Sequence, residues 1–273
     1  MPNNSDQEHA GRVSHLPDRA FVNAFAHVTA AERYAHSCPY YHPVVMEQIR
    51  RTLELSAPVT RALDVGCGTG QSTMALLKLA REVVGVDPSP AMLAHAPRDA
   101  RLTFAVAPAE DLPFPDSSFD LITVAAAFHW FDRERFLGEA ARVLRPAAWL
   151  VLYDNAFLGV MEDQPAFGAW VRAVYVAHYP SPPRDRRPLT AEQASHYSFR
   201  LTEVKRYTNT MTFTPEQLVA YLMTQSNVIA AVEEGRESVE EVTRWLSLEV
   251  AHHFSRPQAA FHFGGTVTYL HKH

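Results

Sequence analysis

Three alternating glycines in the segment 62–71 are the first feature that can support chemistry. Gly66, Gly68 and Gly70 directly follow an apolar run. A glycine turn between a strand and a helix lets a ligand approach the backbone closely. About 20 residues further on, a second apolar run ends at Asp87, whose carboxylate can accept hydrogen bonds from both hydroxyls of a ribose. The pattern predicts a site for a cofactor that contains a nucleoside, with an ordinary strand–turn–helix junction as the alternative.

The residues around these glycines distinguish between cofactors. A dinucleotide fingerprint requires another glycine where this chain has Gln71, and no Gly-Lys-Ser/Thr sequence follows to form a P-loop. Asp64 lies two residues before Gly66, near the place that a pyrophosphate would occupy. A carboxylate repels a diphosphate and attracts a cation. S-adenosylmethionine carries a sulfonium and an ammonium group and has no phosphate, so the sequence predicts S-adenosylmethionine rather than NAD.

Short apolar runs alternate with helical stretches through the first half of the chain. Short, largely apolar runs without strict alternation are typical of strands buried on both faces, and their alternation with helices is typical of a parallel sheet. We expect strands at 62–65, 83–86, 102–106, 121–124 and 149–153. We expect helices at 43–56, 71–80, 89–96 and 132–144.

The rhythm changes after residue 155, and this change defines the expected organisation of the chain. The following insert contains aromatic residues and a stretch rich in proline and arginine, and beyond it we expect strands at 201–213 and 261–270 and helices from 214 and over 237–254. The chain is accordingly divided into a polar tail (1–18), a cofactor-binding α/β core with an N-terminal helical segment (19–155), a lid or substrate insert (156–200), and C-terminal strands and helices that complete the same domain (201–273).

Two further motifs carry a resemblance to a known family. Residues 109–120 read Ala-Glu-Asp-Leu-Pro-Phe-Pro-Asp-Ser-Ser-Phe-Asp, and residues 127–132 read Ala-Phe-His-Trp-Phe-Asp. Over residues 30–155 the chain resembles class I S-adenosylmethionine-dependent methyltransferases of the "methyltransferase domain 11" type, and its His-Trp pair resembles the trans-aconitate methyltransferase-like subgroup. The resemblance implies a Rossmann-like α/β fold. Its sheet is mostly parallel and seven-stranded, with an antiparallel last strand, helices on both faces and a helical lid insert.

The resemblance also implies roles for individual residues. The glycine turn would pass beneath the methionine and ribose parts of the cofactor, Asp87 would bind the ribose, and the backbone at Ala126 would meet the ammonium group. The full expected cofactor set is Tyr34, Asp64, Gly66, Cys67, Gly68, Gly70, Asp87, Pro88, Met92, Ala109, Glu110 and Ala126. The chain departs from many relatives at Pro108, where an aspartate is common, and at Cys38, where an arginine is common.

Candidate residues for the methyl acceptor lie after the expected fourth strand and in the insert. His129 is a candidate catalytic base or orienting group, with a hydrogen-bonded wall histidine as the alternative. The full expected substrate set is His129, Trp130, Trp170, Arg184, Arg186 and Arg187. Trp130 and the insert aromatics have packing as their alternative role, and the arginines have a solvated loop as theirs. Positioning an acceptor against an activated methyl group can contribute ~7–11 kcal/mol.

Composition limits the remaining possibilities. The net charge of −5, with 30 acidic and 25 basic residues, disfavours general binding of nucleic acid or anionic membrane. The first residues have no apolar core typical of a signal peptide, and no His or Cys spacing matches a metal site. We therefore expect a cytoplasmic, metal-independent methyltransferase acting on a small molecule, with a carboxylate among the candidate acceptors. An RNA or protein methyltransferase and a non-catalytic cofactor-binding protein are the alternatives, and the oligomeric state stays open.

Overall fold

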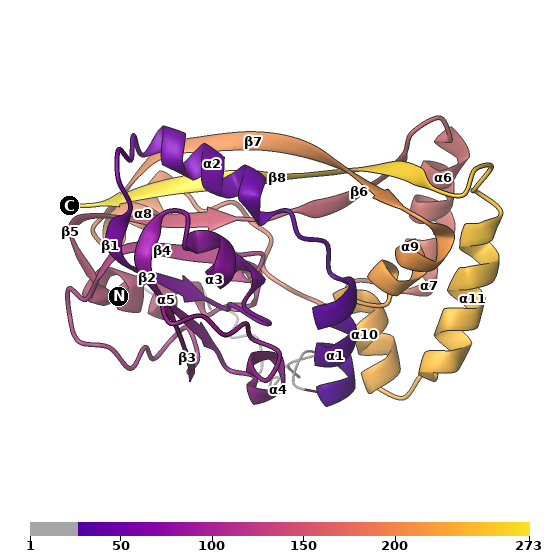
Figure 1. Cartoon of the computed structure of the whole chain (residues 1–273), viewed down its shortest axis with the longest axis horizontal. Coiled ribbons are helices and arrows are strands. Elements are labelled where there is room, and N and C mark those ends of the chain that lie inside the picture. Colours follow the sequence, from indigo (N-terminus) through magenta and orange to yellow (C-terminus); the bar gives the residue numbers. More distant parts are fainter. Residues whose placement is uncertain (1–26) are drawn as a thin grey trace, which may run out of the picture.

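The computed structural model describes residues 27–273, so the polar tail expected at 1–18 lies outside the described residues. A single eight-stranded sheet organises the described chain, in the order β3-β2-β1-β4-β5-β8-β6, with β7 paired to β8 (Figure 1). The Rossmann-like α/β fold expected from the sequence is confirmed.

The first five strands form the parallel half of the sheet. They are β1 (Val59–Val65), β2 (Ala80–Asp87), β3 (Leu102–Val106), β4 (Phe119–Ala125) and β5 (Leu144–Tyr153). Each expected apolar run lies within one of these strands. The strand order reverses between β1 and β4, and ligands of open α/β sheets bind in the crevice at such a point, beyond the carboxyl ends of the strands.

The C-terminal half contributes antiparallel strands and one strand more than expected. β8 (Ala259–Lys272) is antiparallel to β5, to β6 (Ala156–Met161) and to β7 (Phe199–Phe213). Only the last part of the long strand β8 pairs with β5, so its first part is free to pair with β6. The sheet therefore has one strand more than the seven expected. The additional strand is β6, whose residues were expected to begin the helical insert.

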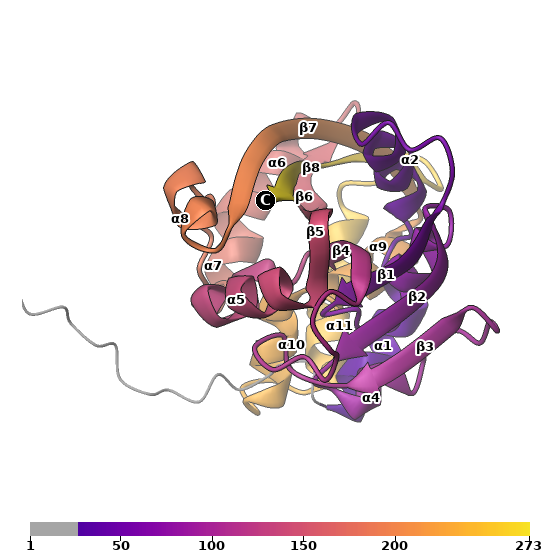
Figure 2. The same cartoon turned by 90° about the vertical axis from the view of Figure 1, so that its left-hand side faces the viewer.

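Helices cover the parallel half on both faces (Figure 2). They are α1 (Val28–Ser37), α2 (His42–Thr52), α3 (Gln71–Leu76), α4 (Pro90–Leu93) and α5 (Arg133–Val143), with a 3-10 turn at Phe128–Trp130. α3 and α4 are shorter than expected. The chain already enters β2 at Ala80, and Pro97 follows α4 closely, which disfavours helix at the residue before it.

The remaining helices gather at the far end of the long strands (Figure 1). They are α6 (Pro165–Trp170), a π-helical turn (Val171–Tyr175), α7 (Val176–His178), α9 (Pro215–Leu222), α10 (Ser226–Glu233) and α11 (Val239–Ala251). The exception is α8 (Ala191–His196). α9 begins at the capping box expected from the sequence, in which the Thr214 hydroxyl accepts a hydrogen bond from the Gln217 amide. α8 lies apart from this group, against β7.

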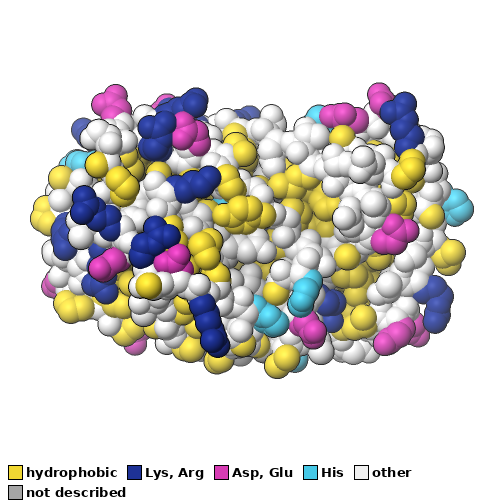
Figure 3. All heavy atoms as spheres, viewed as in Figure 1, with side chains coloured by type: hydrophobic (Ala, Val, Ile, Leu, Met, Phe, Trp, Pro, Cys, Tyr) yellow, Lys and Arg dark blue, Asp and Glu magenta, His cyan; other side chains and the backbone are white. Residues whose placement is uncertain are grey.

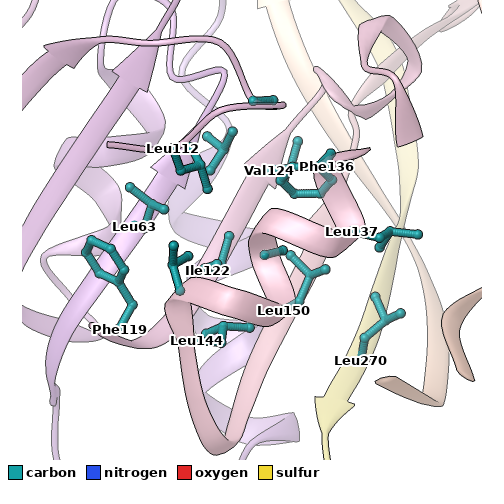
Figure 4. Close-up of a cluster of buried hydrophobic side chains, with 14 of the residues drawn as sticks. Leu63, Leu112, Phe119, Ile122, Val124, Phe136, Leu137, Leu144, Leu150 and Leu270 are labelled. Carbon is teal, nitrogen blue, oxygen red and sulfur yellow. The ribbon is translucent and has the colours of Figure 1, made fainter. Parts of the chain in front are cut away.

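Apolar clusters hold the two ends of the molecule. Figure 4 shows Leu63, Ile122 and Val124 of the sheet facing Phe136 of α5 across a buried layer. A second, aromatic-rich cluster joins β6, β7 and β8 to α6, α9 and α11. On the face seen in Figure 3, Lys and Arg side chains are numerous over the parallel half, with Asp and Glu side chains among them.

Candidate cofactor and acceptor site

The glycine turn after β1 adopts a backbone conformation that favours glycine. Gly66, Gly68 and Gly70 have φ angles of +70°, +55° and +77°. The amides of Gly66 and Cys67 both donate to the Val86 carbonyl, at 2.8 and 3.0 Å, which ties the turn to the end of β2. A Cβ atom on Gly66 would lie only 2.6 Å from the Ala127 Cβ. The turn therefore keeps its backbone free of side chains where a ligand can rest on it.

Asp87, at the end of β2, faces this turn. Its Oδ2 accepts the Gly68 amide at 2.9 Å, and its Oδ1 accepts the Ser89 amide at 2.9 Å. Burial raises the pKa of the carboxyl, and the two amide hydrogen bonds oppose that shift. Because a carboxylate oxygen has two lone pairs, each oxygen keeps one for a further donor. The geometry fits the hydroxyls of a ribose.

Asp64 has a different environment from the one that its sequence position suggests. Its side chain is fully buried and accepts hydrogen bonds from the hydroxyls of Ser72, Thr73 and Thr123, at 2.6, 2.8 and 3.0 Å. Burial raises its pKa to about 6, and the three hydroxyls oppose that shift. Asp64 thus links β1 to α3 and β4, while a direct contact with the cofactor stays a prediction.

Among the residues expected around the adenine, Met92 lies beside the turn, Pro88 is exposed, and Glu110 has another partner. Met92 is buried, and a Cβ atom on Gly68 would lie 3.0 Å from its Cε. Ala109 is also buried. The Glu110 side chain, by contrast, accepts the Asp132 amide at 2.8 Å through Oε1 and so supports the start of α5.

The backbone beyond β4 is strained at the position expected to meet the ammonium group. Ala126 has a φ angle of +52°, which is rare for a residue with a Cβ atom, and its amide donates to the Tyr153 carbonyl at 2.7 Å. Such strain costs about 1–3 kcal/mol and concentrates at functional sites. This exposed residue therefore marks the end of β4 with a strained backbone.

A pocket of about 210 Å³ opens beside the glycine turn, under α1 and the α1–α2 connection. It is lined by Ala35, Tyr40, Thr69, Gln71, Met74, His95 and Pro97. Within residues 27–273, the buried Thr69 Oγ1 and Gln71 Oε1 have no hydrogen-bond partner. Gln71 Nε2 donates to the Cys38 carbonyl at 3.5 Å, and the Cys38 thiol is hydrogen-bonded to the Tyr34 side chain. The end of α1 therefore borders the glycine turn. The polar atoms of Thr69 and Gln71 there are available to a ligand.

The structure brings His129, Trp130 and Arg184 together from two separate segments. Arg184 Nη1 lies 3.3 Å from His129 Nε2, and its Cζ lies 5.4 Å from the centre of the Trp130 ring. Ser226 accepts a further hydrogen bond from Nη1 at 3.2 Å. Burial lowers the pKa of His129 to about 4, and the positive charges of Arg186 and Arg133 lower it further. A neutral histidine and an arginine thus meet beyond the end of β4.

Not all expected acceptor residues join this group. The side chain of Arg187 is 83% exposed and pairs with Asp185. Trp170 is buried among Phe167, Tyr175 and Trp245, and its indole N–H donates to Glu249 Oε2 at 2.7 Å. Trp170 therefore packs α6 onto the C-terminal helices, which is the packing role that its sequence left open.

Arg133 was not among the residues expected from the sequence, although it holds the loop that contains Arg184, Arg186 and Arg187. From the start of α5 its guanidinium donates to the carbonyls of Asp185 and Arg187 and lies 3.5 Å from the Asp185 carboxylate. Its Cζ also lies 4.6 Å from the centre of the Phe128 ring. No sequence spacing relates position 133 to 185–187, so only the folded chain reveals the contact.

A parallel sheet with a glycine turn, an acid after the next strand and a crevice at the strand ends defines a nucleoside-cofactor enzyme. The profile of the family described as "Methyltransferase domain" matches residues 63–152. An uncharacterized methyltransferase of Mycobacterium tuberculosis, Rv3342, is 31% identical over 226 residues, which cover 80% of this chain and 84% of that protein. The chain belongs to the class I S-adenosylmethionine-dependent methyltransferases.

Further comparisons agree with this family. The structure of a putative type II methyltransferase from Anaeromyxobacter dehalogenans is 26% identical, with a TM-score of 0.63, over 86% of this chain and 97% of that one. Demethylmenaquinone methyltransferase of Thermus thermophilus is 43% identical over 116 residues, which cover 38% of this chain and 52% of that protein. The second match therefore concerns only part of this chain.

The site residues fit S-adenosylmethionine. The positive-φ glycines leave a bare backbone, Asp87 has lone pairs for ribose hydroxyls, and Thr69 and Gln71 offer unpaired polar atoms. When bound, this cofactor supplies an already activated methyl group on a sulfonium. The task of the chain is to hold the acceptor in line and to exclude water. Among residues 27–273 there is no group of three or more potential metal ligands, and no helix there has the length and apolarity to cross a bilayer.

Proposed function

We propose that this methyltransferase acts on a small molecule with an anionic group, and that Arg184 binds that group beside His129. The observation that carries the proposal is the position of Arg184, which reaches from the insert to His129, just beyond the end of β4. Its Nε, within the described residues, is buried without a hydrogen-bond partner. An unpaired buried donor is costly, and a carboxylate would satisfy it in the planar geometry that guanidinium favours.

The state of His129 supports a carboxylate as the nucleophile. Arginine can only donate hydrogen bonds, so His129 Nε2 accepts from Arg184 and its lone pair is occupied. A hydroxyl or carbon acid would need a base, whereas a carboxylate is already ionised at neutral pH. We assign His129 the orienting role, with its Nδ1–H as a donor, rather than that of a general base.

The lid that we propose is narrower than the segment 156–200 expected from the sequence. The first residues of that segment form β6, α6 packs in the C-terminal cluster, and α8 packs against β7. The part proposed to cover the acceptor is the connection 180–190, together with the N-terminal segment 34–41. Arg186 is exposed on this connection and lies close enough to influence His129, so it would attract the anion while Arg184 binds it.

Two relatives whose names state a small-molecule acceptor support the proposal of a small-molecule methyltransferase. The demethylmenaquinone methyltransferase and a 2-methyl-6-phytyl-1,4-hydroquinone methyltransferase of Synechocystis are named for small quinone-type acceptors. Their matches cover 38% and 37% of this chain, so they bear on reaction class and not on the acceptor of this chain. Membership of the trans-aconitate methyltransferase-like subgroup, indicated by His129-Trp130, stays a prediction, as do the cytoplasmic location and the absence of a nucleic-acid partner.

The experiment begins by identifying the acceptor. A metabolite extract is incubated with the protein and S-adenosylmethionine, and mass spectrometry identifies the molecule that gains one CH₂. Arg184→Ala should then raise the KM for that acceptor about ten- to a hundredfold, as for loss of a charged hydrogen bond, and leave S-adenosylhomocysteine affinity intact. Arg187→Ala is the matched control. An unchanged KM in Arg184→Ala, or a polymeric acceptor, would contradict the proposal.

A further inference from the structure

Glu233, the last residue of α10, contacts three side chains from the other end of the chain. Its Oε1 accepts from Arg33 Nη2 at 3.3 Å and from Thr29 Oγ1 at 3.4 Å, and its Oε2 lies 3.0 Å from His27 Nδ1. The Glu233 and Arg33 side chains are only 12% and 17% exposed. Because the Glu233 carboxylate has three partners and is largely shielded from solvent, it holds α1 more firmly than an exposed ion pair would.

The helix held by Glu233 spans the two halves of the molecule. α1 packs on α4 of the parallel half and on α9 of the C-terminal half. In Figure 1 it stands between α4 and α10. Ala35 of α1 lines the pocket beside the glycine turn, and the Cys38 carbonyl just beyond α1 accepts from Gln71. The position of α1 therefore determines how that side of the glycine turn is covered.

We propose that Glu233 is a positioning residue for cofactor binding. It touches neither the glycine turn nor the pocket. It acts through Arg33 and Thr29, which hold α1 so that Ala35 and the Cys38 carbonyl stay beside the turn. If the cofactor binds in the pocket bordered by α1, loosening these contacts should speed its release. The inference concerns the cofactor alone and does not depend on which acceptor is methylated.

The test measures binding kinetics with S-adenosylhomocysteine as the probe, by stopped-flow displacement or surface plasmon resonance. Glu233→Gln keeps the shape of the side chain and removes its charge. We expect the probe to dissociate about three- to tenfold faster, the ratio that corresponds to loss of a partly exposed ion pair. Glu234→Gln is the matched control, because Glu234 is the next residue, is 59% exposed and pairs with Arg236; its dissociation rate should equal that of the wild type.

The salt dependence of the dissociation rate is a second measurement. A purely structural role of Glu233 would not change it. Screening weakens ion pairs, so raising ionic strength should speed dissociation from the wild type and have a smaller effect on Glu233→Gln. If the probe dissociates from Glu233→Gln at the wild-type rate, the proposal is overturned, even if the melting temperature of the variant is lower. If Glu233→Gln does not fold, Arg33→Gln and the salt dependence of the wild type decide the question in the same way.

Discussion

Arg184 Nη1 lies 3.3 Å from His129 Nε2, and this contact sets the protonation of the histidine. A guanidinium has no acceptor atom, so Nε2 must be the acceptor. A neutral imidazole carries its proton on the other nitrogen, which is Nδ1 here. Residues 55 positions apart in the chain thus fix both the charge and the tautomer of the candidate orienting group.

The first prediction concerns this histidine. Burial and the nearby arginine charges lower the pKa of His129 to about 4, so the ring should stay neutral at every pH above about 5. Nitrogen-15 NMR of the histidine side chains should show the Nδ1–H tautomer for His129 at pH 7 and should show its protonation near pH 4. A midpoint near 6.5, or the Nε2–H tautomer, would contradict the assignment and restore His129 as a candidate base.

The second prediction concerns the ribose contact at Asp87. Asp87→Ala removes a carboxylate that also accepts the Gly68 and Ser89 amides. Loss of a charged hydrogen bond costs ~1.5–3 kcal/mol, so affinity for S-adenosylhomocysteine should fall about ten- to a hundredfold in calorimetry. Asp99→Ala, which removes a carboxylate that accepts hydrogen bonds from Arg101, is the control. Wild-type affinity in Asp87→Ala would show that Asp87 does not hold the ribose.

The cofactor half was predictable from the sequence because its signals are local. The strand before Gly66, the glycines themselves and Asp87 at the next strand end are each recognisable within a few residues. The contacts of Arg133 with the 185–187 backbone and of Glu233 with Arg33 were not predictable. Each joins residues distant in sequence through one side chain, and neither leaves a periodic pattern. β6 was missed for a related reason, since its pairing depends on how far β8 extends past β5.

The third prediction separates backbone strain from packing in the glycine turn. Gly70 and Gly235 have φ angles of +77° and +70°, so alanine at either position adopts a strained backbone at a cost of about 1–2 kcal/mol. A Cβ atom on Gly70 would also lie 2.8 Å from Pro97 Cδ, whereas a Cβ atom on Gly235 would have no neighbour within 4 Å among residues 27–273.

Urea unfolding should therefore show a larger loss of stability for Gly70→Ala than for Gly235→Ala, by about 1–3 kcal/mol, the usual cost of overpacking. Both variants alter the unfolded chain in the same way, so the difference reports the contacts of the added Cβ atom with Pro97 and Phe104. Equal losses for the two variants would mean that α4 and its following turn shift without cost, and that the glycine turn does not need the packing seen here.

The last prediction concerns acid stability and His42. The buried imidazole contacts the Tyr41 ring and lies 3.0 Å, through Nδ1, from the Tyr153 hydroxyl. Burial lowers its pKa from 6.5 to about 3. Between these two values the unfolded chain binds a proton that the folded chain does not, so stability is complete above pH 6.5 and falls as pH drops toward 3.

One such proton contributes at most about 1.4 kcal/mol per pH unit. His42→Phe keeps an aromatic ring in the site but cannot titrate, so it should be less stable than the wild type at pH 7.5, since the Tyr153 hydroxyl loses its partner, and should lose less stability between pH 6.5 and 4.5. His252→Gln, at an exposed position, is the matched control. Urea unfolding at a series of pH values measures both slopes. Parallel curves for the wild type and His42→Phe would show that another group causes the acid sensitivity.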